Sequence, residues 1–244
     1  MTPRPLITTS WDDGHPLDLR VAGILARHGL RGTFYIPVQP VAGGLLSTGE
    51  MRTLLDMGME IGSHSVTHPI LTDVPEATVD REMRESRFTL EHALGVGVTS
   101  FCYPKGRFND NVALRAKLAG YRVGRTTVGF QTDLHFDPLR MPVSVQLIRH
   151  HAWMHCRHAL RQGNWNGLSD WLFRMGGESD VEKLTSRLLE RISARGGVFH
   201  LWGHSWEIEK NGLWPQLERL AATLGKLPTA VHVTNRQTGE AAFP

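Results

Sequence analysis

Cysteine is scarce in this chain of 244 residues, which contains only Cys102 and Cys156. Two thiols cannot build the disulfide framework of a small secreted protein, and such low cysteine usage is typical of a reducing compartment. The chain also lacks an apolar run long enough to span a bilayer, and its first residues, MTPRPLITTSW, lack the apolar segment of a signal peptide. These absences predict a cytoplasmic protein with no integral membrane segment.

The chain also has little excess of charge of either sign. The 27 Lys and Arg residues are nearly balanced by 24 Asp and Glu residues, and they are spread along the chain instead of forming a block. This pattern argues against a nucleic-acid partner. Hydrophobic residues make up 41% of the chain, which is enough to build a sizeable core. Because no internal repeat or low-complexity tract divides the sequence, we expect a single domain over residues 1–244.

Short β-branched apolar runs alternate with amphipathic helical patterns along most of the chain. Strands are predicted at residues 6–11, 32–37, 59–64, 98–104, 121–126, 141–148, 197–204 and 229–234, and helices at 17–28, 47–58, 75–94, 110–119, 180–194 and 213–224. This alternation predicts an α/β fold with a parallel sheet, and about eight strands indicate a closed or nearly closed barrel. Residues 150–177, rich in His, Arg and Trp, break the pattern and are interpreted as a lid or an insertion.

Two adjacent carboxylates, Asp12 and Asp13, follow the first predicted strand and precede Gly14. Their mutual repulsion and the partial desolvation of a strand end make the pair costly unless something positive lies beside it. A simple turn is the alternative interpretation, because Asp and Gly are common turn residues. Residues elsewhere in the chain decide between the two.

Two histidines, His64 and His68, follow the third predicted strand at a spacing of four residues. Alone, two loop histidines are more typical of surface or packing roles than of metal binding. In a parallel barrel, however, they share one rim with the carboxylates, because the C-terminal ends of the strands meet there. One Asp and two His are the ligand set of a catalytic divalent site. The second Asp is then free to act as a base.

Four stretches resemble motifs of the polysaccharide deacetylases with the NodB homology domain, also called carbohydrate esterase family 4. They are TSWDDG, HSVTH, FCYPKG and FHLWGHSWE, and they occur in the family's order. The resemblance covers nearly the whole chain and implies a distorted (β/α) barrel of about seven parallel strands. It also implies one divalent metal ion as cofactor, with zinc expected.

The resemblance further implies a role for each motif residue. Asp12 is expected to be the catalytic base, and Asp13, His64 and His68 are expected to hold the metal. The backbone N–H of Tyr103 is expected to help bind the oxyanion, and a histidine on the late strand to protonate the leaving amine. The implied activity is hydrolysis of the amide of an N-acylated, and by expectation N-acetylated, sugar or glycoconjugate.

The sequence departs from the family pattern at Cys102, where the third motif normally has an arginine that pairs with the catalytic Asp. A thiol cannot make a bidentate pair with a carboxylate. We predict that Arg140 supplies the missing guanidinium and belongs to the catalytic residues, with a plain surface arginine as the alternative. We interpret Cys102 as a small buried residue, not as a nucleophile.

The last motif offers two histidines, His200 and His204. We predict that His204 is the general acid because it ends its strand, whereas His200 lies about 13 Å deeper at roughly 3.3 Å per residue. Glu207 is predicted to orient His204, or else to be an ordinary residue at a helix start. Further candidates are a second metal site at His151, His155 and His158, which we disfavour, and sugar-stacking tryptophans at Trp153, Trp165, Trp171, Trp202 and Trp206.

Other functions stay open. A hydrolase of another small non-peptide amide, such as a cyclic amide, uses the same chemistry. A catalytically silent carbohydrate-binding relative would account for the departures from the motifs, although binding alone does not need a free carboxylate beside a metal. A metal phosphoesterase is less well supported, because the sequence contains no phosphate-cradling glycine loop.

Overall fold

The computed structural model describes residues 4–149, 165–174 and 176–242. Its centre is a parallel sheet with the strand order β5-β4-β3-β2-β1-β7-β6. The strands are β1 (Leu6–Asp12), β2 (Gly32–Ile36), β3 (Glu60–Ser63), β4 (Ser100–Cys102), β5 (Val123–Arg125), β6 (Val145–Gln146), β7 (Val198–Gly203) and β8 (Val231–His232). Every strand pair among these described residues is parallel, which confirms the predicted α/β class.

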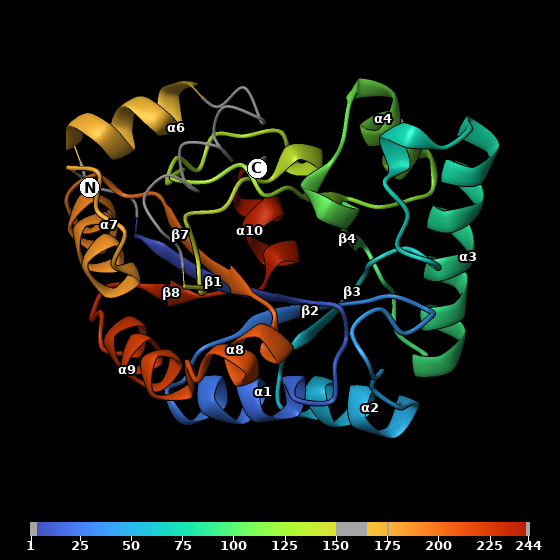
Figure 1. Cartoon of the computed structure of the whole chain (residues 1–244), viewed down its shortest axis with the longest axis horizontal. Coiled ribbons are helices and arrows are strands. Elements are labelled where there is room, and N and C mark those ends of the chain that lie inside the picture. Colours follow the sequence, from blue (N-terminus) through green and yellow to red (C-terminus); the bar gives the residue numbers. More distant parts are fainter. Residues whose placement is uncertain (1–3, 150–164, 175, 243–244) are drawn as a thin grey trace.

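The seven strands of this path curl into a half-barrel (Figure 1). β8 pairs only with Leu6 and Ile7 at the start of β1, whereas β2 pairs with the later residues Thr9 to Asp12 of the same strand. An isolated parallel bridge between Arg125 and Met141 links β5 to the segment that leads into β6. The prediction of a distorted barrel of about seven parallel strands is therefore confirmed. The strands of the described ranges do not close into a ring of eight equal members, because β8 is a short addition to the side of β1.

Helices flank the sheet, with α1 and α2 on one side and α10 on the other (Figure 1). The helices are α1 (Asp18–Arg27), α2 (Thr48–Asp56), α3 (Glu76–Leu94), α4 (Asp110–Leu118), α6 (Trp165–Ser169), α7 (Val181–Arg195), α8 (Ser205–Asn211), α9 (Trp214–Gly225) and α10 (Asn235–Ala242). Local signals predicted most of them, such as the capping box of Ser47 and Glu50 that begins α2. The sequence did not predict α8 or α10; α8 begins directly after β7 with no side-chain cap.

The two faces of β1 meet different surroundings. Ile7 and Trp11 point into the main hydrophobic core. On the other face, the Thr8 hydroxyl donates to the side-chain oxygen of Asn235 in α10 at 2.9 Å, and both groups are buried. Since side chains alternate along a strand, Asp12 shares the face of Thr8 and ends a polar row at the rim of the half-barrel.

No helix within the described ranges is both long enough and apolar enough to cross a membrane. Of the predicted lid or insertion at residues 150–177, the structure describes α6, the helical turn Asp170–Arg174 that follows it, and residues 176 and 177. Residues 150–164 and 175 lie outside the described residues. That part contains His151, His155, His158, Trp153 and Cys156.

Candidate active site

The two adjacent carboxylates lie in a sharp turn at the end of β1. Asp12 is the last residue of the strand, and the next two residues, Asp13 and Gly14, have positive φ angles of 77° and 60°. A left-handed backbone is strained for a residue other than glycine, and such strain is frequent at functional sites. Asp12 and Asp13 are 3% and 5% exposed. The strand end is therefore a turn, but its carboxylates are buried, unlike those of a surface turn.

Asp13, His64 and His68 come together at this rim. The Asp13 Oδ1 atom lies 3.7 Å from Nε2 of His64 and 3.7 Å from Nε2 of His68, and the two Nε2 atoms are 3.1 Å apart. The Oδ1 atom is buried and has no hydrogen-bond partner within the described residues. One carboxylate oxygen and two imidazole nitrogens at these separations fit the donor set of a divalent ion.

Neighbouring groups orient these three side chains. His64 Nδ1 lies 2.8 Å from the carbonyl oxygen of Cys102. Because a carbonyl only accepts, Nδ1 carries the hydrogen and Nε2 presents its lone pair to the site. The indole N–H of Trp206 donates to Asp13 Oδ2 at 2.9 Å, which leaves Oδ1 as the oxygen that faces the histidines.

Burial keeps both histidines neutral, as metal ligation requires. It lowers the pKa of His64 below its ordinary value. For His68, burial and then the neighbouring His64 lower the pKa to about 4. Neutral imidazoles and an ionised carboxylate are the states in which these residues bind metal ions.

Arg125, at the end of β5, forms a fully buried ion pair with Oδ1 of Asp12. Its guanidinium carbon also lies 4.8 Å from the ring centre of Trp202 and 5.4 Å from that of Tyr35. The Cys102 thiol is 3.7 Å from Asp12 Oδ2. The guanidinium that the third motif lacks is therefore supplied by the neighbouring strand.

The prediction that Arg140 supplies this guanidinium is corrected by the structure. Arg140 pairs with Asp110 at 2.9 Å and with Asp137 at 3.3 Å, and it is a partly exposed surface arginine. It ends the short 3-10 helix Pro138–Arg140 outside the sheet, whereas Arg125 sits in β5 directly beside β4. Arg125 lies within the predicted strand 121–126, but only the pairing of β4 with β5 reveals its position.

The ionisation of Asp12 is determined by opposing effects. Burial raises its pKa, but the positive charge of Arg125, together with His64 and His204, outweighs burial and lowers the pKa to about 2. Asp12 is thus a carboxylate that is ionised at neutral pH, with one oxygen bound to Arg125 and the other close to Cys102 and His204.

His204 lies on the same rim as the carboxylates. Its Nε2 atom is 4.0 Å from Asp12 Oδ2 and 3.9 Å from Asp13 Oδ2, and its Nδ1 atom is 2.7 Å from Glu207 Oε2. Burial alone lowers the pKa of His204, but the hydrogen bond to Glu207 and the negative charge of Asp12 raise it above its ordinary value. The imidazole can therefore hold a proton beside Asp12 near neutral pH.

His200 lies deeper in the half-barrel and is 1% exposed. Its Nε2 atom is 2.8 Å from the Ser10 hydroxyl, and its Nδ1 atom is 3.2 Å from the carbonyl oxygen of Pro142. Burial and then Arg125 lower its pKa to about 3, so the ring is neutral. The hydrogen bonds of His200 therefore link β7 to β1 and to the segment that precedes β6.

The structure also corrects the role expected for Tyr103. Its backbone N–H donates to the carbonyl oxygen of Arg125 at 3.2 Å, extending the pairing of β4 with β5, and is therefore not directed at a substrate. Its side chain is buried, and the hydroxyl donates to the carbonyl oxygen of Leu139 at 2.8 Å. Tyr103 thus acts as a packing residue behind the site.

The family model described as polysaccharide deacetylase matches residues 1–124, half of the chain. The chain belongs to the polysaccharide deacetylase family, carbohydrate esterase family 4. The matched half contains the first three motifs and ends one residue before Arg125. Arg125 and His204, which lie beside Asp12, are both beyond the matched part.

Individual family members are similar at low identity. Chitin deacetylase 1 of Cryptococcus neoformans is 29% identical over 134 residues, which are 51% of this chain and 28% of that protein. The chain covers less than half the length of the curated relatives that it matches, 44% and 28%. A crystal structure of a Mycobacterium smegmatis protein is similar in fold, with a TM-score of 0.65 at 16% identity, covering 98% of this chain and 91% of that one. A family 4 carbohydrate esterase from Streptomyces lividans, solved with acetate, has a TM-score of 0.54 at 19% identity and covers 92% of this chain and 91% of that one.

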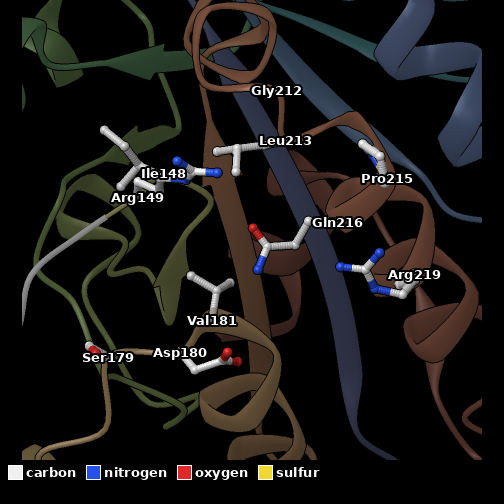
Figure 2. A pocket seen from close by; sticks show the side chains of 10 residues that line it. All are labelled: Ile148, Arg149, Ser179, Asp180, Val181, Gly212, Leu213, Pro215, Gln216 and Arg219. Carbon is white, nitrogen blue, oxygen red and sulfur yellow. The ribbon is translucent and has the colours of Figure 1, made fainter.

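A separate hollow of about 340 Å³ lies between the end of β6 and the starts of α7 and α9 (Figure 2). Its lining includes Arg149, Asp180, Gln216 and Arg219, and none of the predicted site residues. Arg219 is already paired with Glu182 at 2.7 Å. The hollow is therefore distinct from the family's carboxylate and histidine site.

Two of the candidate tryptophans flank the general-acid candidate. The ring centres of Trp202 and Trp206 lie 5.6 Å and 5.5 Å from that of His204. Trp171 is buried and donates its N–H to the carbonyl oxygen of Glu178, so it belongs to the core. Trp165 is 66% exposed on α6.

Proposed function

We propose that this protein is a metal-dependent deacylase that hydrolyses the amide of an N-acylated sugar or glycoconjugate, with an N-acetyl group as the first candidate. The observation that supports this most is the separation of tasks between adjacent carboxylates. Asp13 faces two neutral histidines, while Asp12 is ionised and bound to Arg125 instead. A binding module has no use for the second carboxylate.

The donor set of Asp13, His64 and His68 would hold the ion, and the buried Oδ1 atom without a partner fits this role. A divalent ion bound there would lower the pKa of water and stabilise negative charge on an acyl oxygen. We expect zinc, because two imidazoles and one carboxylate are common zinc ligands.

The chain's own residues would move the protons. Asp12 accepts a proton at Oδ2, since Arg125 binds Oδ1 and fixes the plane of the carboxylate. His204 donates a proton from Nε2 to the leaving nitrogen, while Glu207 holds the hydrogen at Nδ1. The general acid is necessary because an amine anion is a very poor leaving group.

Two family members support the reaction class. One is named a chitin deacetylase, and another, a carbohydrate esterase, was solved with acetate, the product that deacetylation would release. Hydrolysis of another small non-peptide amide would use the same residues and stays the alternative. A silent carbohydrate-binding protein is disfavoured, because Arg125 replaces the guanidinium whose absence suggested it.

The test is acetate release from N-acetylated sugars and chitooligosaccharides by the zinc-loaded protein, with N-formylated sugars in parallel. Wild type, Asp12→Asn and Asp13→Ala are compared, with Asp110→Asn as a control in which an exposed carboxylate is changed. We expect activity in wild type and control only, and zinc bound to every protein except Asp13→Ala. Equal zinc content in Asp13→Ala would contradict the ligand assignment, and binding of sugar without turnover would favour the silent relative.

A further inference from the structure

The loop that holds both histidines, residues 64–68, is called the ligand loop here. Two of its non-glycine residues, Ser65 and His68, have positive φ angles of 67° and 58°. Left-handed backbone at such residues costs free energy and persists only where the surroundings enforce it. Something outside the loop must therefore hold this conformation.

Glu82 of α3 is directed into the ligand loop. Its Oε2 atom accepts the backbone N–H of Val66 at 2.7 Å and that of Thr67 at 2.8 Å, and its Oε1 atom accepts the Thr67 hydroxyl at 2.7 Å. The side chain is 2% exposed although it lies in the middle of a helix. All the hydrogen bonds that the described residues give to this carboxylate come from the ligand loop.

A second contact one helical turn away holds the same region. The Ser86 hydroxyl lies 2.8 Å from that of Ser63, the last residue of β3, and both are buried. Residues four apart lie on the same face of a helix, so Glu82 and Ser86 form a row on α3 that faces β3 and its following loop. The Ser65 hydroxyl, which accepts the N–H of His68 at 3.0 Å, closes the loop from within.

The ligand loop gathers the donor atoms of both histidines in one place. The Nε2 atoms of His64 and His68 lie 3.1 Å apart, and each is 3.7 Å from Oδ1 of Asp13. An unconstrained loop would separate the rings, and a metal ion would then have to draw them together again. Each restraint from α3 reduces that reorganisation.

We propose that Glu82 is a positioning residue that preorganises the ligand loop and thereby sets the affinity of the site for its divalent ion. The inference rests on the proposed function only in requiring that a divalent ion binds at Asp13, His64 and His68. It assigns to Glu82 no contact with substrate.

The experiment measures Zn²⁺ affinity of the full-length chain by competition with a chromophoric chelator, without substrate. Glu82→Gln places an amide NH₂ against donors that need an acceptor, and we expect affinity to fall about 10- to 100-fold, the usual cost of losing an outer partner of a ligand. Glu85→Gln is the matched control, with the same substitution on an exposed position of the same helix, and should bind Zn²⁺ like wild type.

Thr67→Val is a second variant that tests the same contact from the loop. Thr67 is exposed, so this variant should fold, and removal of the hydroxyl donor should weaken Zn²⁺ binding about two- to tenfold. In the double variant the loss should be less than the product of the single losses, because both act through one contact. If Glu82→Gln does not fold, the single variant Thr67→Val tests the proposal instead.

Each outcome has one meaning. Weakened Zn²⁺ binding in Glu82→Gln, with an unchanged far-UV circular dichroism spectrum and a normal Glu85→Gln control, supports the role of Glu82. Wild-type affinity in Glu82→Gln, or in Thr67→Val when the former does not fold, overturns it and leaves the proposed function intact. A wild-type protein that binds no divalent ion overturns both.

Discussion

Cys102 and Arg125 are register partners on the adjacent strands β4 and β5, and Arg125 binds the carboxylate of Asp12. The family motif that FCYPKG resembles has arginine where this chain has Cys102. Moving the arginine to the same level of the next strand keeps its guanidinium within reach of Asp12. Cys102 itself is buried on β4, with 1% of its surface exposed.

Replacing Arg125 by Met should leave the Asp12 carboxylate buried without its ion partner. We expect the free energy of unfolding to fall by about 3–5 kcal/mol, the usual cost of breaking a buried pair on one side. Burial, which raises the pKa of Asp12, would then be opposed less, so the acidic limb of the kcat/KM profile should move to higher pH. Urea unfolding and a pH–rate profile test these two effects separately.

The strand exchange itself has a direct test. The double variant Cys102→Arg with Arg125→Cys should recover part of the activity that Arg125→Cys alone loses, because it restores the arrangement typical of the family. If the double variant is no better than Arg125→Cys, the two positions are not equivalent and the register argument is wrong.

Asp12→Asn should retain zinc and lose about 10²- to 10⁴-fold in turnover, the usual loss for a general base. The amide keeps the shape of the side chain but cannot accept the proton. Metal content is measured in the same samples as activity, by elemental analysis. Near-normal turnover with zinc in place would show that Asp12 has a structural role.

His204→Ala should lose amide hydrolysis, whereas an activated ester, whose leaving group needs little protonation, should be much less affected. His200→Ala should instead lower the unfolding temperature, because it leaves the buried Ser10 hydroxyl without its partner. Both variants are checked for metal content. Loss of amide turnover in a folded His200→Ala, with His204→Ala unaffected, would reverse the assignment.

Trp206→Phe removes the indole N–H that binds Asp13 Oδ2 and keeps a smaller aromatic ring beside His204. We expect zinc affinity to fall about 10- to 100-fold, since groups that orient a metal ligand have effects of this size. The control is Trp165→Phe, at an exposed tryptophan of α6. A sugar-stacking role alone would instead change KM and leave zinc affinity at the wild-type value.

Asp18 gives a pH-dependent prediction, because this carboxyl is fully buried at the start of α1. Burial raises its pKa well above the ordinary value of 3.8, and the charges of Asp12 and Asp13 add to the effect. Its contribution to stability is therefore complete below pH 3.8 and is lost as the pH rises toward the folded pKa. Relative to wild type, Asp18→Asn should gain stability from pH 4 to pH 7.

The measurement for Asp18 is urea unfolding at several pH values in the presence of a chelator, so that metal binding does not add its own pH dependence. Asp110→Asn, on an exposed residue, serves as the control. A stability difference between Asp18→Asn and wild type that does not change with pH would show that the carboxyl is not perturbed.

Local signals explain why much of the fold could be predicted from the sequence. The capping box at Ser47 and the glycine stop at Gly95 fix helix ends through nearby residues alone. The side position of β8 and the open curl of the sheet depend on which strands pair. The residues 229–234 predict a strand, but they do not show that it pairs with β1 beside β2. The helix α10 was missed for the same reason, since Asn235 is held by distant Thr8.

The candidate site, like the fold, could be predicted from the sequence only in part. Asp12, Asp13, His64 and His68 follow strand ends, so the rule that such ends share a rim was enough to place them together. Three other contacts at the site depend on tertiary packing. They are made by Arg125 of β5, Trp206 of the short helix α8 and Glu82 of the long helix α3. Arg140 and Tyr103 were assigned wrongly because sequence position does not show which groups are already hydrogen bonded.

The position of β1 has a consequence for biosynthesis. One edge of β1 pairs with β2, about twenty residues later, but the other pairs with β7 at residues 198–203. During translation, that second edge has no partner until most of the chain has left the ribosome, and an unpaired strand edge invites association with other chains. A nascent or truncated chain that ends before residue 198 would therefore leave this edge of β1 exposed, whereas β7 covers it in the described structure.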